Sequence, residues 1–184
     1  MGIWREQPGV LPCAVAAVIA LLCAGCASTT DTPAPSARGP LPAGSAPSAI
    51  SRMVCSTKAL KELDDVLGVT GTVSTPAWSD HTYSCHYRYA RGSFALTVKE
   101  LSSWPQTYAY FGGLGGTLGN TGKTTGLGQA AFTTNNGAVV VRKDWKVLTV
   151  DISGLPPQFG VPPTSAADTA YTIADVIMGC WNGD

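Results

Sequence analysis

The amino-terminal part of the chain limits what the rest can fold into, because it is suited to export and tethering rather than to a globular core. Residues 13–25 read CAVAAVIALLCAG, an apolar run that follows Arg5 and ends in the small residues Ala24 and Gly25. This run is too short to span a bilayer, since a transmembrane helix needs about 20 residues. Its layout is typical of a secretory signal. We therefore expect residues 1–25 to be a signal peptide and the mature protein to be extracytoplasmic.

Cys26 follows this run directly, in the sequence LLCAGC. The segment resembles the lipobox of bacterial lipoproteins, in which two small residues stand before a cysteine that receives a diacylglyceryl group. Cys23 replaces the usual branched aliphatic residue of that motif. The resemblance implies a lipidated Cys26 on the outer face of the cell membrane, where two or three acyl chains anchor a protein stably. The alternative is a plain signal peptide that leaves Cys26 as a free or disulfide-bonded thiol.

A proline-rich stretch separates Cys26 from the remaining chain. Residues 28–51 contain five prolines and few large apolar side chains, so they bury too little apolar surface to offset their ordering entropy. We expect residues 26–52 to be a disordered tether that holds the domain roughly 25–30 Å above the membrane. Residues 53–184 then form a single domain, which is large enough for a core of its own.

The charge pattern narrows the range of partners. The chain contains 12 Lys and Arg residues and 12 Asp and Glu residues, with no block of like charge. Nucleic acids and anionic membrane surfaces are bound through a concentrated cationic face. We therefore expect no nucleic acid partner, and contact with the membrane only through the lipid on Cys26.

A change of hydrophobic period early in the domain indicates a mixed fold. Ser56 can cap a helix over residues 57–67, and Gly68 can end it. We expect four residues to share its apolar face: Leu60, Leu63, Val66 and Leu67. From residue 83 to residue 98 apolar and polar residues alternate on both sides of a turn at 90–93, which predicts a β-hairpin with one buried side.

The rest of the domain also combines predicted helices and strands. Ser103 and Pro105 begin a second helix near Trp104, which the glycines after Phe111 weaken. Three short strands follow between residues 130 and 153, joined by turns at Asn135–Gly137 and around Asp144. A last helix, capped by Ser165, has an apolar stripe of Ala170, Ile173, Ile177 and Cys180. We predict an α+β fold, with a mainly antiparallel sheet of about five to six strands and two to three packed helices.

The mature domain resembles the small actinobacterial lipoproteins of unknown function. The resemblance rests on the lipobox, the tether, VCSTKAL, YSCHY, and GLGQAAF before AVVVRKDWKVLTV. Related LpqN-like proteins are thought to have a Mog/PsbP-like α-β sandwich, so the resemblance implies that fold and supplies no catalytic residues. It also implies a Cys55–Cys85 disulfide, with Cys180 a buried thiol. A Cys55–Cys180 bridge is the alternative, because domain termini often lie close together.

The glycine-rich stretch GGTLGNTGKTTGLGQAA raises the question of phosphate binding. Gly122, Lys123 and Thr124 fit the end of a P-loop, but Thr117 stands where its first glycine is required. GLGQAA fits a dinucleotide-binding pattern but has no preceding strand or following helix. We expect residues 112–128 to be a flexible crossing from helix to sheet, which could serve as a binding loop.

No residue set indicates catalysis or a metal. His81 and His86 are the only histidines, and a strand sends Cys85 and His86 to opposite faces. No serine lies in a nucleophile motif. We expect a non-enzymatic protein without cofactor or metal. An enzyme would need Trp104, Lys123 and Asp144 to converge on the glycine-rich loop.

The aromatic residues near loops are the remaining functional signal. Trp104 stands at a helix start, and Phe159 stands in PPQFGVPP, a stiff loop that could present it to a partner. Together with Lys123 they are our candidate binding loop residues. Our leading hypothesis is a lipid-anchored module that binds an envelope protein, glycan or lipid. The alternative is a carrier that holds an apolar or lipid ligand between its sheet and helices.

Overall fold

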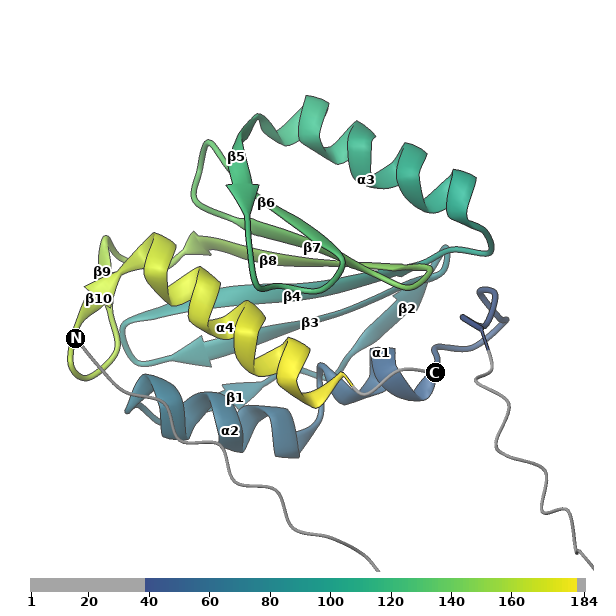
Figure 1. The fold of residues 1–184 in the computed structure, drawn as a ribbon. Helices are drawn as coiled ribbons and strands as arrows, with labels where there is room; N and C mark the ends of the chain where they lie inside the picture. The colour runs from purple at the N-terminus through teal and green to yellow at the C-terminus, as the bar shows by residue number, and fades with distance from the viewer. Residues whose placement is uncertain (1–38, 182–184) are drawn as a thin grey trace, which may run out of the picture. The chain divides into compact units, whose positions relative to one another are not determined.

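The computed structural model describes residues 39–181, which belong to one compact unit. The expected signal peptide and Cys26 lie outside the described residues. An antiparallel sheet of eight strands forms the middle layer of this unit, in the order β1-β3-β4-β8-β7-β6-β5, with β2 also paired to β3 (Figure 1). The strands are β1 Gly71–Val73, β2 Ala77–Ser79, β3 Thr82–Tyr89, β4 Gly92–Glu100, β5 Asn120–Thr124, β6 Ala130–Thr134, β7 Val139–Lys143 and β8 Lys146–Gly154. A separate pair joins β9 Gln158–Phe159 to β10 Thr164–Ser165.

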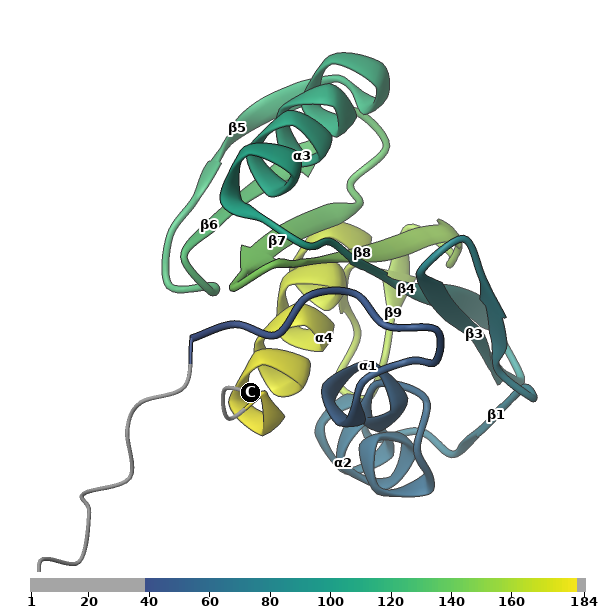
Figure 2. The same ribbon diagram turned by 90° about the vertical axis from the view of Figure 1, so that its right-hand side faces the viewer.

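Helices cover both faces of the sheet. They are α1 Ala49–Met53, α2 Thr57–Leu67, α3 Trp104–Leu118 and α4 Ala166–Cys180. α2 and α4 lie on one face and α3 lies on the other (Figures 1 and 2). The larger hydrophobic core lies between the sheet and the α2–α4 layer, and a smaller one lies under α3. No helix within residues 39–181 is long and apolar enough to cross a membrane.

The predicted α+β class with a mainly antiparallel sheet is confirmed, but the sheet has more strands than we expected. The strands that we did not predict are β1, β2 and β5, each three to five residues long. They lie at the outer edges, where β1 and β2 both pair with β3 and β5 pairs with β6. Edge strands this short show too few residues for an alternating pattern to be recognised.

The first long helix forms as its sequence signals indicate. The Ser56 hydroxyl accepts a hydrogen bond from the Ala59 amide at 3.1 Å, and Gly68 ends α2 with a φ of 64°. The expected apolar face is wrong in one position, because Val66 is 53% exposed. Ala59, seven residues earlier on nearly the same side of the helix, is buried, so this side of α2 is covered at its start and exposed at its end.

The predicted hairpin is formed by β3 and β4, with a shorter turn at residues 90–91. Its register sets Tyr87 opposite Phe94, and the two rings stack with centroids 4.8 Å apart. Both rings are buried in the larger core. Cross-strand aromatic pairs of this kind stabilise a sheet beyond the area they bury.

Helix α3 begins where we predicted but ends later. Ser103 caps it by accepting a hydrogen bond from the Gln106 amide, and the helix continues through the glycines to Leu118. Phe111, Leu114 and Leu118 pack on the smaller core below. A helix-interior glycine costs about 1 kcal/mol relative to alanine, so tertiary packing outweighs the local propensity here.

Residues 43–52, which we expected to lie in the disordered tether, pack on the domain. The Ala43 amide donates to the Leu101 carbonyl at 3.0 Å, and the Trp78 indole donates to the Ser45 carbonyl at 3.1 Å. This segment therefore runs along the end of the sheet before it enters α1 (Figure 2).

A buried carboxylate holds the same segment. Glu100 is 4% exposed, and its carboxylate accepts hydrogen bonds from the Ser48 amide and the Ser51 hydroxyl. A buried carboxylate is costly without such donors. The expected domain start at residue 53 is therefore corrected, because residues 43–52 belong to the folded unit.

Candidate functional site

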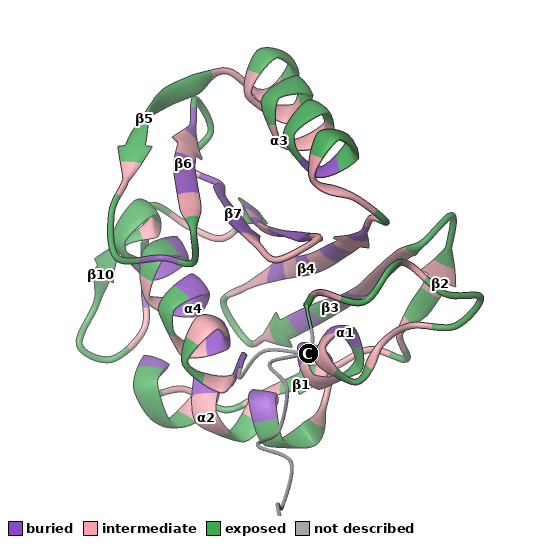
Figure 3. Ribbon diagram, turned by 45° about the vertical axis from the view of Figure 1, so that its right-hand side comes forward, coloured by how far each residue is buried: buried purple, intermediate pink, exposed green. Residues whose placement is uncertain are grey.

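α3 packs against β6 through the smaller hydrophobic core. Phe111 on α3 meets Phe132 on β6 in an edge-to-face contact with centroids 5.0 Å apart. Phe132, Val140 and Val147 are the buried residues of this smaller core. The helix above them is mostly exposed or half-buried, whereas β6 and β7 are largely buried (Figure 3). α3 therefore lies over the sheet on a narrow apolar stripe.

The glycine-rich stretch is not one flexible crossing. Its first half completes α3, Asn120–Thr124 forms β5, and only residues 125–129 remain a loop. Gly126 and Gly128 have φ values of 85° and 52°, so both lie in the left-handed region that favours glycine. The Tyr171 hydroxyl on α4 donates to the Thr125 carbonyl at 3.3 Å, which ties the loop to the opposite layer.

Beneath α3 a cavity of about 460 Å³ is lined by Phe111, Asn120 and residues 123–132. We call it the α3 groove. Its volume falls within the range of about 300–1,000 Å³ usual for small-molecule sites. The groove has an apolar side that includes Phe111 and Phe132, and a polar side that includes Lys123 and Gln129. It can therefore accept a ligand with both an apolar body and a polar group.

Among the residues that the structure describes, Lys123 is the one charged residue that lines the groove. None of its lining residues is acidic. Lys123 is exposed on β5, and its ammonium forms no ion pair or hydrogen bond within the described residues. An unpaired cation at the rim of an apolar groove can bind an anionic group of a ligand.

A second cation, Arg142, lies beside the groove but is already enclosed. Its guanidinium carbon is 5.6 Å from the ring centroid of Trp104, 4.7 Å from that of Tyr108 and 5.9 Å from that of Phe111. One guanidinium nitrogen donates to the Gln129 side-chain oxygen at 3.2 Å. Arg142 is 9% exposed, so these aromatic faces replace much of the water around its charge.

Gln129 connects this cluster to Asp144. Its side-chain oxygen accepts from the Asp144 amide at 3.0 Å, and its side-chain nitrogen donates to the Asp144 carboxylate at 3.4 Å. The structure thus gathers Trp104 and Asp144 around the contact between Arg142 and Gln129, while Lys123 lines the groove with Gln129. This network holds the charges of Arg142 and Asp144 in fixed positions beside the groove.

Sequence reasoning missed Arg142 and Gln129. The run AVVVRKDW lies within the segment that we predicted to form short strands, and in β7 Val139 and Val141 face the larger core. Arg142 alternates with them and so faces α3. A lone arginine in a run of valines is the signal that could have identified it, because buried arginine is rare without partners.

Phe159 does not lie with the other two candidates. It is 4% exposed in β9 and meets the Tyr89 ring edge to face with centroids 5.4 Å apart. The expectation that its loop presents Phe159 to a partner is therefore corrected. Trp104 and Lys123 belong to the α3 side of the sheet, whereas Phe159 belongs to the larger core.

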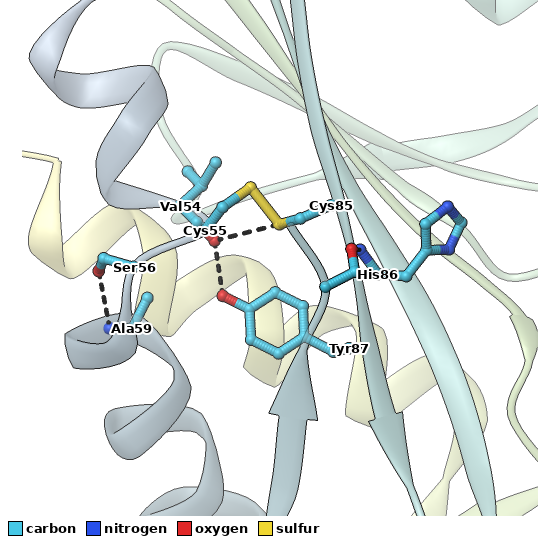
Figure 4. The surroundings of a disulfide bond; sticks show 8 residues. Val54, Cys55, Ser56, Ala59, Cys85, His86 and Tyr87 are labelled. Carbon is cyan, nitrogen blue, oxygen red and sulfur yellow. Dashed lines mark hydrogen bonds between the residues drawn. A yellow bond between two sulfur atoms is a disulfide. The ribbon is translucent and has the colours of Figure 1, made fainter. Parts of the chain in front are cut away.

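The disulfide implied by the family resemblance is present between Cys55 and Cys85, with Cα atoms 5.9 Å apart. Figure 4 shows it between the start of α2 and strand β3, next to the Tyr87 hydroxyl, which donates to the Val54 carbonyl at 2.6 Å. Burial, and then the Asp64 carboxylate, raise the pKa of Tyr87. We assign the disulfide a structural role, since both cysteines are buried in the larger core.

Cys180 is the free cysteine among the described residues. It is half-buried on α4 and its thiol donates to the Glu62 carboxylate at 2.6 Å, so it lies less deeply than we expected. Burial, and then the bond to Glu62, raise its pKa. A raised pKa makes the thiol a poor nucleophile.

His81 and His86 do not form a shared binding site. His81 donates from Nδ1 to the Gly44 carbonyl at 3.0 Å, and so holds the amino-terminal segment. His86 is exposed and points away from Cys85 across the strand (Figure 4). In the described part of the chain, no three His, Cys, Asp or Glu side chains are grouped to hold a metal ion.

Comparisons of the chain with protein-family models, with curated proteins and with solved structures found no match.

Proposed function

We propose that this chain is a lipid-anchored extracytoplasmic envelope protein that acts as a non-enzymatic binding module through the α3 groove. The observation that carries the binding role is the groove itself, where Phe111 and Phe132 border an apolar space of about 460 Å³. The exposed Lys123 ammonium at its rim has no ionic partner among residues 39–181. A site of this composition suits a ligand with an apolar body and a hydrogen-bond acceptor.

The envelope location rests on two separate features. The resemblance of LLCAGC to a lipobox supports lipidation at Cys26. The disulfide between Cys55 and Cys85 suits an oxidising compartment. Residues 43–52 pack on the domain, so the segment between Cys26 and the domain is shorter than the tether over residues 26–52 that we expected from the sequence.

A second candidate function is a carrier of an apolar or lipid ligand. It is favoured by the position of the groove, which lies between a helix and the sheet. The space between the sheet and the α2–α4 layer is less suitable, because packed side chains such as Leu96, Val150 and Ile173 fill it. A carried lipid would therefore lie under α3.

Native mass spectrometry of the mature protein, purified with mild detergent from its own host, tests the site. Thr124 lines the groove from β5, and Thr124→Trp should fill it. Thr121→Trp is the matched control, since Thr121 is exposed on the same strand and does not line the groove. We expect a bound mass in the wild type and in Thr121→Trp, its loss in Thr124→Trp, and a severalfold decrease in Lys123→Gln.

If Thr124→Trp retained the same bound mass, the α3 groove would not be the binding site. A clean apo mass in every form would count against the carrier. Turnover of a substrate that a single side-chain change abolishes would overturn the non-enzymatic assignment.

A further inference from the structure

A second cavity lies at the end of the sheet where β3 turns into β4. It has a volume of about 210 Å³, and we call it the β9 pocket. The residues that matter here are Val69, Tyr89, Arg91, Phe159 and Val161. They come from the α2–β1 loop, from the end of β3 and the β3–β4 turn, and from β9 and the segment after it. The pocket and the α3 groove share no lining residue.

Backbone contacts fix the walls of the β9 pocket. The Val161 amide donates to the Leu67 carbonyl at 2.8 Å, which ties the segment after β9 to the end of α2. Gly160 has a φ of 91°, and a side chain there would come within 3.0 Å of the Leu67 carbonyl oxygen. A side chain at Gly71 would overlap the Tyr89 ring. The two glycines thus allow neighbouring segments to approach closely beside the pocket.

The surroundings of the pocket are apolar. The Tyr89 and Phe159 rings meet edge to face, and a smaller cavity of about 100 Å³ lies on the other side of the same segment. Val66 and Val161 beside these cavities are 53% and 65% exposed. Exposed branched side chains next to a cavity indicate a surface that an apolar group can cover.

One charge borders this apolar space. Arg91 lies in the exposed β3–β4 turn, and its guanidinium forms no ion pair within residues 39–181. No lining residue of the pocket is acidic. The Asp64 carboxylate accepts hydrogen bonds from the Gly71 amide and does not line the pocket. Arg91 is therefore available to a carboxylate, which its planar guanidinium can hold in a bidentate pair.

We propose that the β9 pocket binds a small carboxylate with a compact apolar body, either branched aliphatic or a single ring. The body would lie against Tyr89 and Val161, and the carboxylate would pair with Arg91. The volume lies below the range of about 300–1,000 Å³ that drug-sized ligands need, so a long acyl chain does not fit. This site is independent of the function proposed for the α3 groove.

The test uses the mature full-length protein and two acids, 4-methylpentanoate and phenylacetate, with their primary amides as uncharged isosteres. Protein-observed NMR titration gives the affinities. We expect saturable binding of at least one acid in the millimolar range or tighter, and at least tenfold weaker binding of its amide. Arg91→Gln should abolish this preference. Arg88→Gln is the matched control, because Arg88 is exposed on β3 and does not line the pocket.

A substitution that blocks the β9 pocket distinguishes binding in this pocket from binding elsewhere on the protein. Ala90 lines the mouth of the β9 pocket and is exposed, so Ala90→Trp should block binding without burying new polar groups. Thr124→Trp, in the α3 groove, should leave binding of the acids unchanged. Equal affinity for acid and amide, equal effects of the two arginine variants, or no saturable binding of either acid at 20 mM would each overturn the proposal.

Discussion

At the scale of single residues, the α3 side of the protein depends on how one buried charge is accommodated. Arg142 has Gln129 as its hydrogen-bonding partner and three aromatic rings around it. Guanidinium is weakly hydrated and planar, so it tolerates such a setting where an ammonium would not. With Arg142 held by the rings, Lys123 is the cation left at the groove for a ligand.

The larger core contains buried tyrosines whose protonation is linked to stability. Burial is the main cause that raises the pKa of both Tyr87 and Tyr89, and the Asp64 carboxylate adds to it. In the unfolded chain a tyrosine loses its proton near pH 10. Above that pH the unfolded state binds fewer protons than the folded state, so the free energy of unfolding decreases.

We therefore expect the free energy of unfolding to be insensitive to these tyrosines below pH 10. Above pH 10 it should fall by up to about 1.4 kcal/mol per pH unit for each tyrosine. Urea unfolding between pH 8 and pH 11 measures this slope. Tyr87→Phe should be less stable at pH 8 by about 1 kcal/mol, because it loses the bond to Val54, and should show a shallower decline above pH 10. An unchanged slope in Tyr87→Phe would contradict the account.

At the scale of elements, sequence patterns predicted the helix starts, because these depend on local capping residues. Ser56, Ser103 and Ser165 cap the helices that we expected, and each accepts an amide hydrogen bond from within the first turn. The end of α3 was beyond such reasoning, because the contacts of Leu114 and Leu118 with the sheet extend a helix that its glycines disfavour. The sequence did not reveal the role of Arg142 for a related reason. Its aromatic partners lie on α3, and local patterns do not predict that α3 packs over β7.

The glycines of α3 give a direct test of this balance. A methyl group added at Gly112 or Gly116 would have no atom within 4 Å apart from the helix itself. We expect Gly112→Ala and Gly116→Ala each to stabilise the protein by about 0.5–1 kcal/mol in urea unfolding. Gly160→Ala should instead destabilise it, because of the positive φ and the Leu67 carbonyl. Destabilisation by the two helix variants would mean that their exposed face has a function in packing that we have not identified.

At the scale of the whole molecule, the folded unit includes residues 43–52, and the proposed anchor is Cys26. The disulfide closes a loop of 30 residues, and the chain-entropy model assigns it roughly 3–4 kcal/mol. The sequence could not show that residues 43–52 pack on the domain, because their contacts with Trp78, His81 and Glu100 come from distant strands.

The most direct measurement is the intact mass of the protein extracted from its native membrane, before and after alkylation of thiols under denaturing conditions without reductant. The account predicts a chain that begins at Cys26 and carries acyl groups, with one alkylated thiol at Cys180 and a disulfide between Cys55 and Cys85. A soluble product without acyl groups, or one with three alkylated thiols in the domain, would contradict it.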